Sequence, residues 1–166
     1  MSIKTKKLTA LALGVALAMI LSFVESQLPP LTAVPGVKLG LSNIVTVVLL
    51  YSFGWREAWA VSLVRVCLSA LLFGNAAAFI YSLSGAVLSF FTMLLSKRFL
   101  PFGTVGVSVI GGVMHNVGQV IAAIIVMESI GIAYYLIPLL VSGTVAGVLV
   151  GIASGIVASR VAKFIK

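Results

Sequence analysis

The sequence contains no aspartate, and its only acidic residues are three glutamates among 166 positions. It has one cysteine, Cys67, and one histidine, His115. A single cysteine excludes an intrachain disulfide, and so few sulfur, imidazole and carboxylate groups offer no metal-ligand cluster. Charged residues make up 8% of the chain, against about a quarter in a soluble domain. This shortage of charge excludes an ordinary soluble fold.

The sequence consists mainly of apolar residues. Hydrophobic residues make up 61% of the chain, and the mean hydropathy is +1.27. The apolar runs are continuous and do not alternate, which favours membrane helices over a β-barrel. Since a membrane helix takes about 20 residues, the length predicts one all-α transmembrane domain over residues 1–166, a bundle of six helices. We expect these helices at about residues 8–24, 39–53, 58–73, 76–96, 104–127 and 133–161.

The basic residues act as topology signals. The net charge is +8, but the cations stand at the ends of apolar runs and form no aromatic-interleaved patch, which argues against a nucleic-acid partner. In a six-span arrangement all but two of them fall on one side: Lys4, Lys6, Lys7, Arg56, Lys97, Arg98, Arg160, Lys163 and Lys166. This asymmetry predicts that both termini are cytoplasmic and that the loop ending at Lys38 is external. A signal peptide is the alternative for the N-terminus, but no good cleavage site follows the first run.

Polar residues inside the apolar runs are the candidate functional groups. Arg65 follows Arg56 by nine residues, which at about 1.5 Å per residue places it near the middle of the membrane. The polar groups converge on the outer half of the bundle and predict a solute site there. Its candidate residues are Lys38, Asn43, Arg65, Asn75, His115, Asn116 and Gln119. Internal hydrogen bonding is the alternative for each of them, and we expect Glu25 and Glu128 at the interface.

Several segments together resemble a known family. They are Pro35-Gly36-Val37-Lys38-Leu39-Gly40-x-x-Asn43, the Gly54-Trp55-Arg56-Glu57 turn, the helix with Arg65, and His115-Asn116-x-x-Gln119. The chain resembles the Gx transporter family, whose members are often labelled heptaprenyl diphosphate synthase component I. That family is similar to the substrate-binding S components of energy-coupling factor (ECF) transporters. The resemblance covers nearly the whole chain, and the Pro-Gly-x-Lys-Leu-Gly-x-x-Asn element is its most specific part.

The resemblance implies a bacterial plasma-membrane protein that captures a small vitamin-like or precursor-like solute from outside. Such proteins dock on a membrane coupling subunit that is carried by two cytoplasmic ATPases. The docking face of ECF S components is an alanine-rich line on the first helix. Here the matching positions are Ala10, Ala12, Gly14, Ala16 and Ala18. Small residues at these spacings also suit helix packing within one chain, and this alternative stays open.

The synthase label conflicts with the composition. Prenyl elongation needs aspartate-rich motifs that hold Mg²⁺ against a diphosphate, and this chain has no aspartate. It also has no Walker glycine loop, so ATP hydrolysis would belong to a partner. We therefore expect a protein that is not an enzyme and has no cofactor or metal. The rival hypothesis is a membrane partner that binds an isoprenoid or quinone and serves prenyl transfer or extracellular electron transfer.

Overall fold

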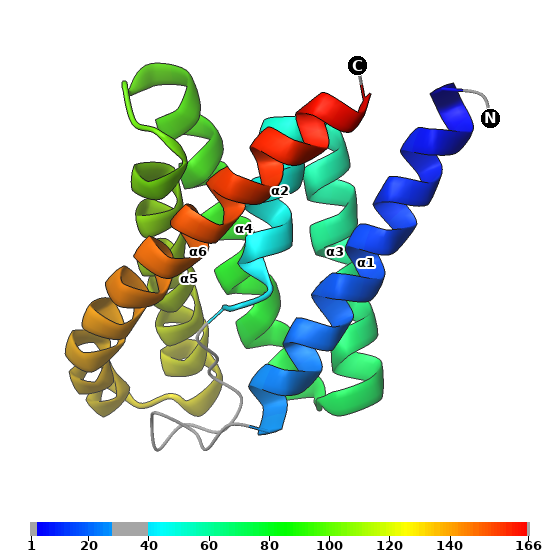
Figure 1. The fold of residues 1–166 in the computed structure, drawn as a ribbon. Coiled ribbons are helices and arrows are strands. Elements are labelled where there is room, and N and C mark those ends of the chain that lie inside the picture. Colours follow the sequence, from blue (N-terminus) through cyan, green and yellow to red (C-terminus); the bar gives the residue numbers. More distant parts are fainter. Residues whose placement is uncertain (1–2, 28–39, 166) are drawn as a thin grey trace.

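The structure is a computed structural model, and it describes residues 3–27 and 40–165. The described residues are helical and contain no strand, which confirms the all-α prediction for them. The described residues form six α-helices and one short 3₁₀-helix. Figure 1 shows both chain ends at the same end of the bundle. The helices are α1 (Ile3–Gln27), α2 (Asn43–Ser52), α3 (Trp55–Phe73), α4 (Ala76–Phe99), α5 (Thr104–Met127), η1 (Ile130–Tyr135) and α6 (Leu136–Ile165).

Four described helices are long and apolar enough to cross a membrane, namely α1, α4, α5 and the stretch from η1 through α6. This is therefore a membrane protein by the length and composition of its helices. Helix α2 is apolar but has only 10 residues. Helix α3 has 19 residues and carries Arg56, Glu57 and Arg65. Large apolar side chains such as Leu8, Ile125 and Ile137 are exposed around the bundle, as lipid-facing residues would be.

Local chain signals explain where several helices begin and end. Asn75 caps α4, because its side-chain oxygen accepts a hydrogen bond from Ala78 N at 2.8 Å. Gly54 has a φ of 123° and ends the turn between α2 and α3. Glu128 adopts a left-handed conformation and ends α5. The prediction for residues 104–127 therefore matches the helix bounds.

Three predicted helix starts differ from the structure. The second helix begins at Asn43 and not at residue 39, because Gly40 takes a φ of 82° and Asn43 N bonds Gly40 O in a turn. The last helix is preceded by the 3₁₀ turn η1 and begins at Leu136, with Pro138 in its first turn, where a missing N–H costs little. The third helix begins at Trp55, three residues earlier than predicted, because the polar residues Trp55–Glu57 already belong to α3.

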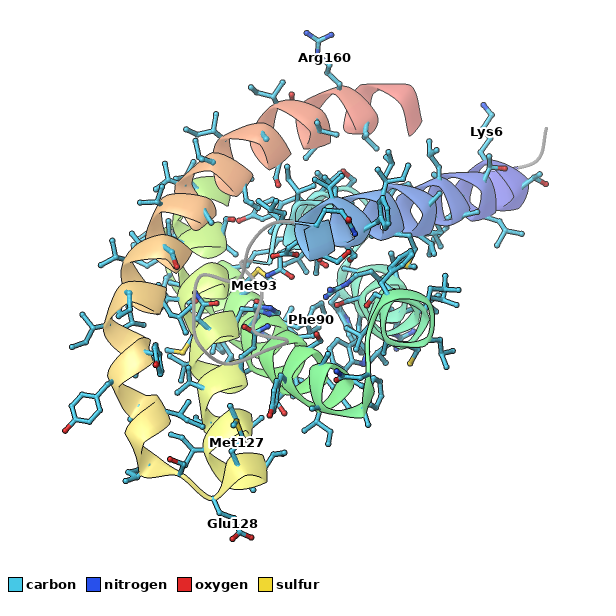
Figure 2. All side chains as sticks on the ribbon, turned by 90° about the horizontal axis from the view of Figure 1, so that it is seen from below. Lys6, Phe90, Met93, Met127, Glu128 and Arg160 are labelled. Carbon is cyan, nitrogen blue, oxygen red and sulfur yellow. The ribbon has the colours of Figure 1, made fainter. Side chains whose placement is uncertain are left out.

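Helix α2 lies inside the bundle, in contact with α1, α3, α5 and α6. Its buried Val47, Leu49 and Leu50 meet Phe90 and Met93 of α4 in the main core. Figure 2 shows Phe90 and Met93 in the interior, whereas Lys6, Glu128 and Arg160 project outward. A second apolar cluster packs η1 against α5 around Val120, Ala123 and Ile132. The bundle thus surrounds its shortest α-helix with longer ones.

Candidate functional site

The chain entering α2 is tied to the end of α1 by a buried carboxylate. Glu25 is 6% exposed, and its Oε1 accepts hydrogen bonds from the backbone N–H groups of Gly40 and Leu41, the latter at 3.4 Å. Glu25 lies on the same buried helix face as Ala18 and Ser22. Glu25 lies two residues before the end of α1, and the turn before α2 covers it, so its side chain is buried within the protein. Its depth at the membrane interface stays a prediction.

Gly40 brings two of the predicted site residues together. A Cβ atom at this position would lie 3.0 Å from Asn43 Nδ2 and 3.2 Å from His115 Cδ2. Both Asn43 and His115 are buried, and they come from α2 and α5. The positive φ of Gly40 and the lack of space for a side chain together explain why glycine occupies this position.

Arg65 lies on the buried face of α3 with Ser62 and Ser69 and is 4% exposed. Its Nη2 has no hydrogen-bond partner among the residues that the structure describes. Glu25 interacts with Arg65 electrostatically, which links the arginine to the turn at Gly40. An arginine buried on an apolar helix, with one donor unpartnered among the described residues, is a candidate functional group.

Two further predicted residues form a pair on α5. Gln119 Nε2 lies 3.1 Å from His115 Nε2, and both side chains are almost fully buried. Gly85 of α4 allows this pair to approach, because a Cβ there would lie 2.9 Å from His115 Cε1 and from Gln119 Cγ. The pair therefore lies between α4 and the turn at Gly40.

Other predicted site residues lie elsewhere. Asn116 turns toward α6, where its Nδ2 donates to Leu139 O at 2.6 Å. Asn75 is exposed and caps α4, so it does not join the buried group. Lys38 lies outside the described residues. The structure thus brings Asn43 and His115 together at Gly40, with Gln119 beside His115. It adds Glu25, which sequence reasoning missed and whose charge acts on Arg65.

A signal for Glu25 exists in the sequence. Gly14, Ala18, Ser22 and Glu25 follow one another at spacings of four, four and three, so they share a single helix face. The first three are small and buried, which marks the face as internal. An acid that continues such a face is placed inside the protein.

The predicted docking positions on α1 differ in burial, because only some of them lie on this buried face. Gly14 and Ala18 are buried, and a Cβ at Gly14 would lie 3.5 Å from Leu49 of α2. Ala10 is half-buried, whereas Ala12 and Ala16 are exposed. The open alternative of packing within the chain thus accounts for Gly14 and Ala18. For the exposed Ala12 and Ala16, docking of a partner stays a prediction.

The cavities near these residues differ in size and polarity. A chamber of about 10 Å³ is lined by Gly40, Asn43, Ser108 and Gly112 among others, and it has room for about one water molecule. A groove of about 460 Å³ runs between α4 and α5 and is almost wholly apolar. Another, of about 490 Å³, lies where α3 meets α4 and includes the exposed Cys67.

Comparison with known proteins identifies the family. The family model described as heptaprenyl diphosphate synthase component I matches residues 15–157. The chain belongs to this family. The match includes every described residue of the group around Gly40. Comparisons with curated proteins and with solved structures gave no match. In the part of this family member that the structure describes, no group of three or more metal-ligating side chains comes together.

Proposed function

We propose that this protein is the solute-binding membrane subunit, or S component, of an ECF-type importer. It captures a small vitamin-like or precursor-like solute from outside the cell. The observation that carries the proposal is the buried guanidinium of Arg65, whose Nη2 has no partner in the described structure. A scaffold has no need of an arginine at this depth, whereas a binding site uses its donors.

The arrangement of the chain supports six crossings, of which the second includes the short helix α2, with both termini in the cytoplasm. The two ends of the chain share one end of the bundle in Figure 1. Lys6, Arg56, Lys97, Arg98 and Arg160 belong to that same end by chain order, which agrees with the positive-inside rule. A bacterial plasma membrane is the location that this proposal implies.

The proposal includes partners and assigns the chemistry to them. ATP hydrolysis belongs to two cytoplasmic ATPases and a membrane coupling subunit, because this sequence has no nucleotide-binding loop. The chain itself is not an enzyme in this proposal, since a sequence without aspartate offers no diphosphate-Mg²⁺ site. Ala12 and Ala16 on the exposed side of α1 are the positions that remain open to the coupling subunit.

Native mass spectrometry of the purified protein tests the proposal. We expect a retained small molecule on the wild-type protein and on Arg56→Gln, a matched control at an exposed arginine. We expect Arg65→Ala to lose it, because the buried donors would no longer meet the solute. A folded Arg65→Ala protein that retains the molecule at wild-type occupancy would remove Arg65 from the site.

A second candidate function rests on the apolar groove between α4 and α5. Its lining residues include Ile80, Leu83, Val87, Ile121 and Ile125, and a lipid-like ligand would enter through such a lateral opening. An isoprenoid or quinone would suit this groove and the family's description as a heptaprenyl diphosphate synthase component. Lipid mass spectrometry separates the two candidates: a stoichiometric prenyl lipid that is lost in Val87→Trp and kept in Arg65→Ala favours the second.

A further inference from the structure

Helix α2 is too short to cross a membrane by itself. Its 10 residues span about 15 Å, roughly half of the hydrocarbon thickness. Each helix end leaves backbone donors or acceptors without an intrahelical partner. Inside a membrane protein such groups must be satisfied by the protein itself. The free backbone groups at the two ends of α2 therefore need hydrogen-bond partners from other parts of the protein.

At the first end, the backbone forms a tight turn and a side chain completes it. Asn43 N, Ile44 N and Val45 N bond the carbonyl oxygens of Gly40, Leu41 and Ser42. The Ser42 side chain makes no capping bond. Among the N–H groups before the helix, those of Gly40 and Leu41 donate to Glu25 of α1. A carboxylate thus stands where the helix dipole is positive.

At the other end, the helix closes with a different turn. Phe53 N and Gly54 N both bond Leu49 O, at 2.9 and 3.1 Å, so the next carbonyl receives no backbone donor from Gly54. Lys97 of α4 fills that place, because its Nζ donates to Leu50 O at 2.6 Å. The same ammonium lies 4.3 Å from the centre of the Tyr51 ring. A cation thus stands where the helix dipole is negative.

We propose that Glu25 and Lys97 are positioning residues that clamp α2 from its two ends and thereby hold Asn43 in place at Gly40. The two charges come from different helices, α1 and α4, and each has the sign that the adjoining helix end favours. The clamp itself rests on these contacts alone. Its importance for solute binding rests on the proposed function.

Amide hydrogen exchange of the full-length protein in lipid nanodiscs tests the clamp. In Glu25→Ala we expect the amides of Gly40 and Leu41 to exchange about tenfold faster or more, because a charge-assisted hydrogen bond is lost. In Lys97→Ala we expect faster exchange at Phe53 and Gly54. Lys97→Arg should restore protection, since a guanidinium can also donate to Leu50 O and lie over Tyr51.

The chain offers matched controls for both variants. Glu57→Ala removes another glutamate, which pairs with Lys7 at the surface, and Arg98→Ala removes the exposed cation beside Lys97. Glu57→Ala should leave exchange at Gly40 and Leu41 unchanged, and Arg98→Ala should leave exchange in residues 40–54 unchanged. Equal exchange in wild type, Glu25→Ala and Lys97→Ala would overturn the clamp. So would equal acceleration over the whole bundle, which would mean general loosening.

A milder variant keeps the test decisive if Glu25→Ala does not fold. In Glu25→Gln the amide oxygen still accepts, but the charge is gone, and the Gly40 amide proton should move upfield in a glycine-labelled NMR spectrum. An unchanged Gly40 signal would overturn the role of the carboxylate. Failure of the proposed function looks different: the exchange and NMR changes appear, but no retained small molecule is found on the wild-type protein.

Discussion

The α5–α6 seam and helix α2 are held in the membrane by opposite means. Along the seam, Gly143, Gly147 and Gly151 of α6 lie directly against the backbone of α5. Their contribution is the absence of side-chain atoms, which lets the two helices approach closely. Helix α2 is held by the presence of charged side chains, Glu25 and Lys97, at its two ends. Long helices can thus be held by close backbone packing along their length. A short helix inside the protein needs hydrogen-bond partners for the backbone groups at its ends.

The largest expected effect is on the seam. Gly147→Ala should destabilise the protein by about 2–3 kcal/mol, because the new Cβ would lie 2.6 Å from Val109 Cα and the helices must separate. Unfolding by denaturing detergent, followed by circular dichroism, measures the change. The control is Gly103→Ala, where nothing lies within 4 Å of the new atom. Equal stability of the two variants would show that the seam is not tightly packed.

A smaller effect is expected where a polar side chain joins the same two helices. Asn116→Leu removes the bond to Leu139 O and should cost about 1 kcal/mol, the range found for hydrogen bonds between membrane helices. Retention of a small molecule should be unchanged, because Asn116 faces α6. The control Thr144→Val removes a bond within α6 only. Loss of the retained molecule in folded Asn116→Leu would return Asn116 to the solute site.

The smallest effect is expected at the surface pair of Lys7 and Glu57. The hydrogen bond from Lys7 holds the pKa of Glu57 below its ordinary value of 4.5. A lowered folded pKa means that the pair stabilises the protein above that value and ceases to do so as the pH falls through the folded pKa. Glu57→Gln should therefore cost less than about 0.5 kcal/mol at pH 7 and nothing in acid. Thermal unfolding of the wild-type protein and of Glu57→Gln, at pH 7 and at a pH well below the folded pKa of Glu57, measures this cost. A cost that persists in acid would contradict this account.

Sequence reasoning predicted the long elements well and the short one badly. The apolar runs of α4 and α5 are long and bounded by Asn75, Gly103 and Glu128, so their limits can be read from composition and chain signals. The start of α2 depends on a backbone turn at Gly40 that only the surrounding structure requires. The predicted start at residue 39 assumed that the helix continues through Gly40, and the positive φ of that residue breaks it.

The candidate site was predicted in the same uneven way. Arg65, His115 and Gln119 stood out because polar residues are rare in apolar runs, and the structure places them at the centre of the bundle. Asn75 and Asn116 are also polar residues in or beside apolar runs. In the structure Asn75 caps α4, and Asn116 bonds to α6. Glu25 was missed because its burial comes from a turn 15 residues further along the chain.

Cys67 gives the protein a built-in attachment point. It is the only thiol in the sequence and is exposed on α3, two residues beyond the buried Arg65. Residues two apart on a helix point in different directions, so a fluorophore or spin label at this sulfur leaves the guanidinium untouched. Wild-type protein can therefore be labelled at one site, without engineering, to follow how α3 moves when a solute or a partner arrives.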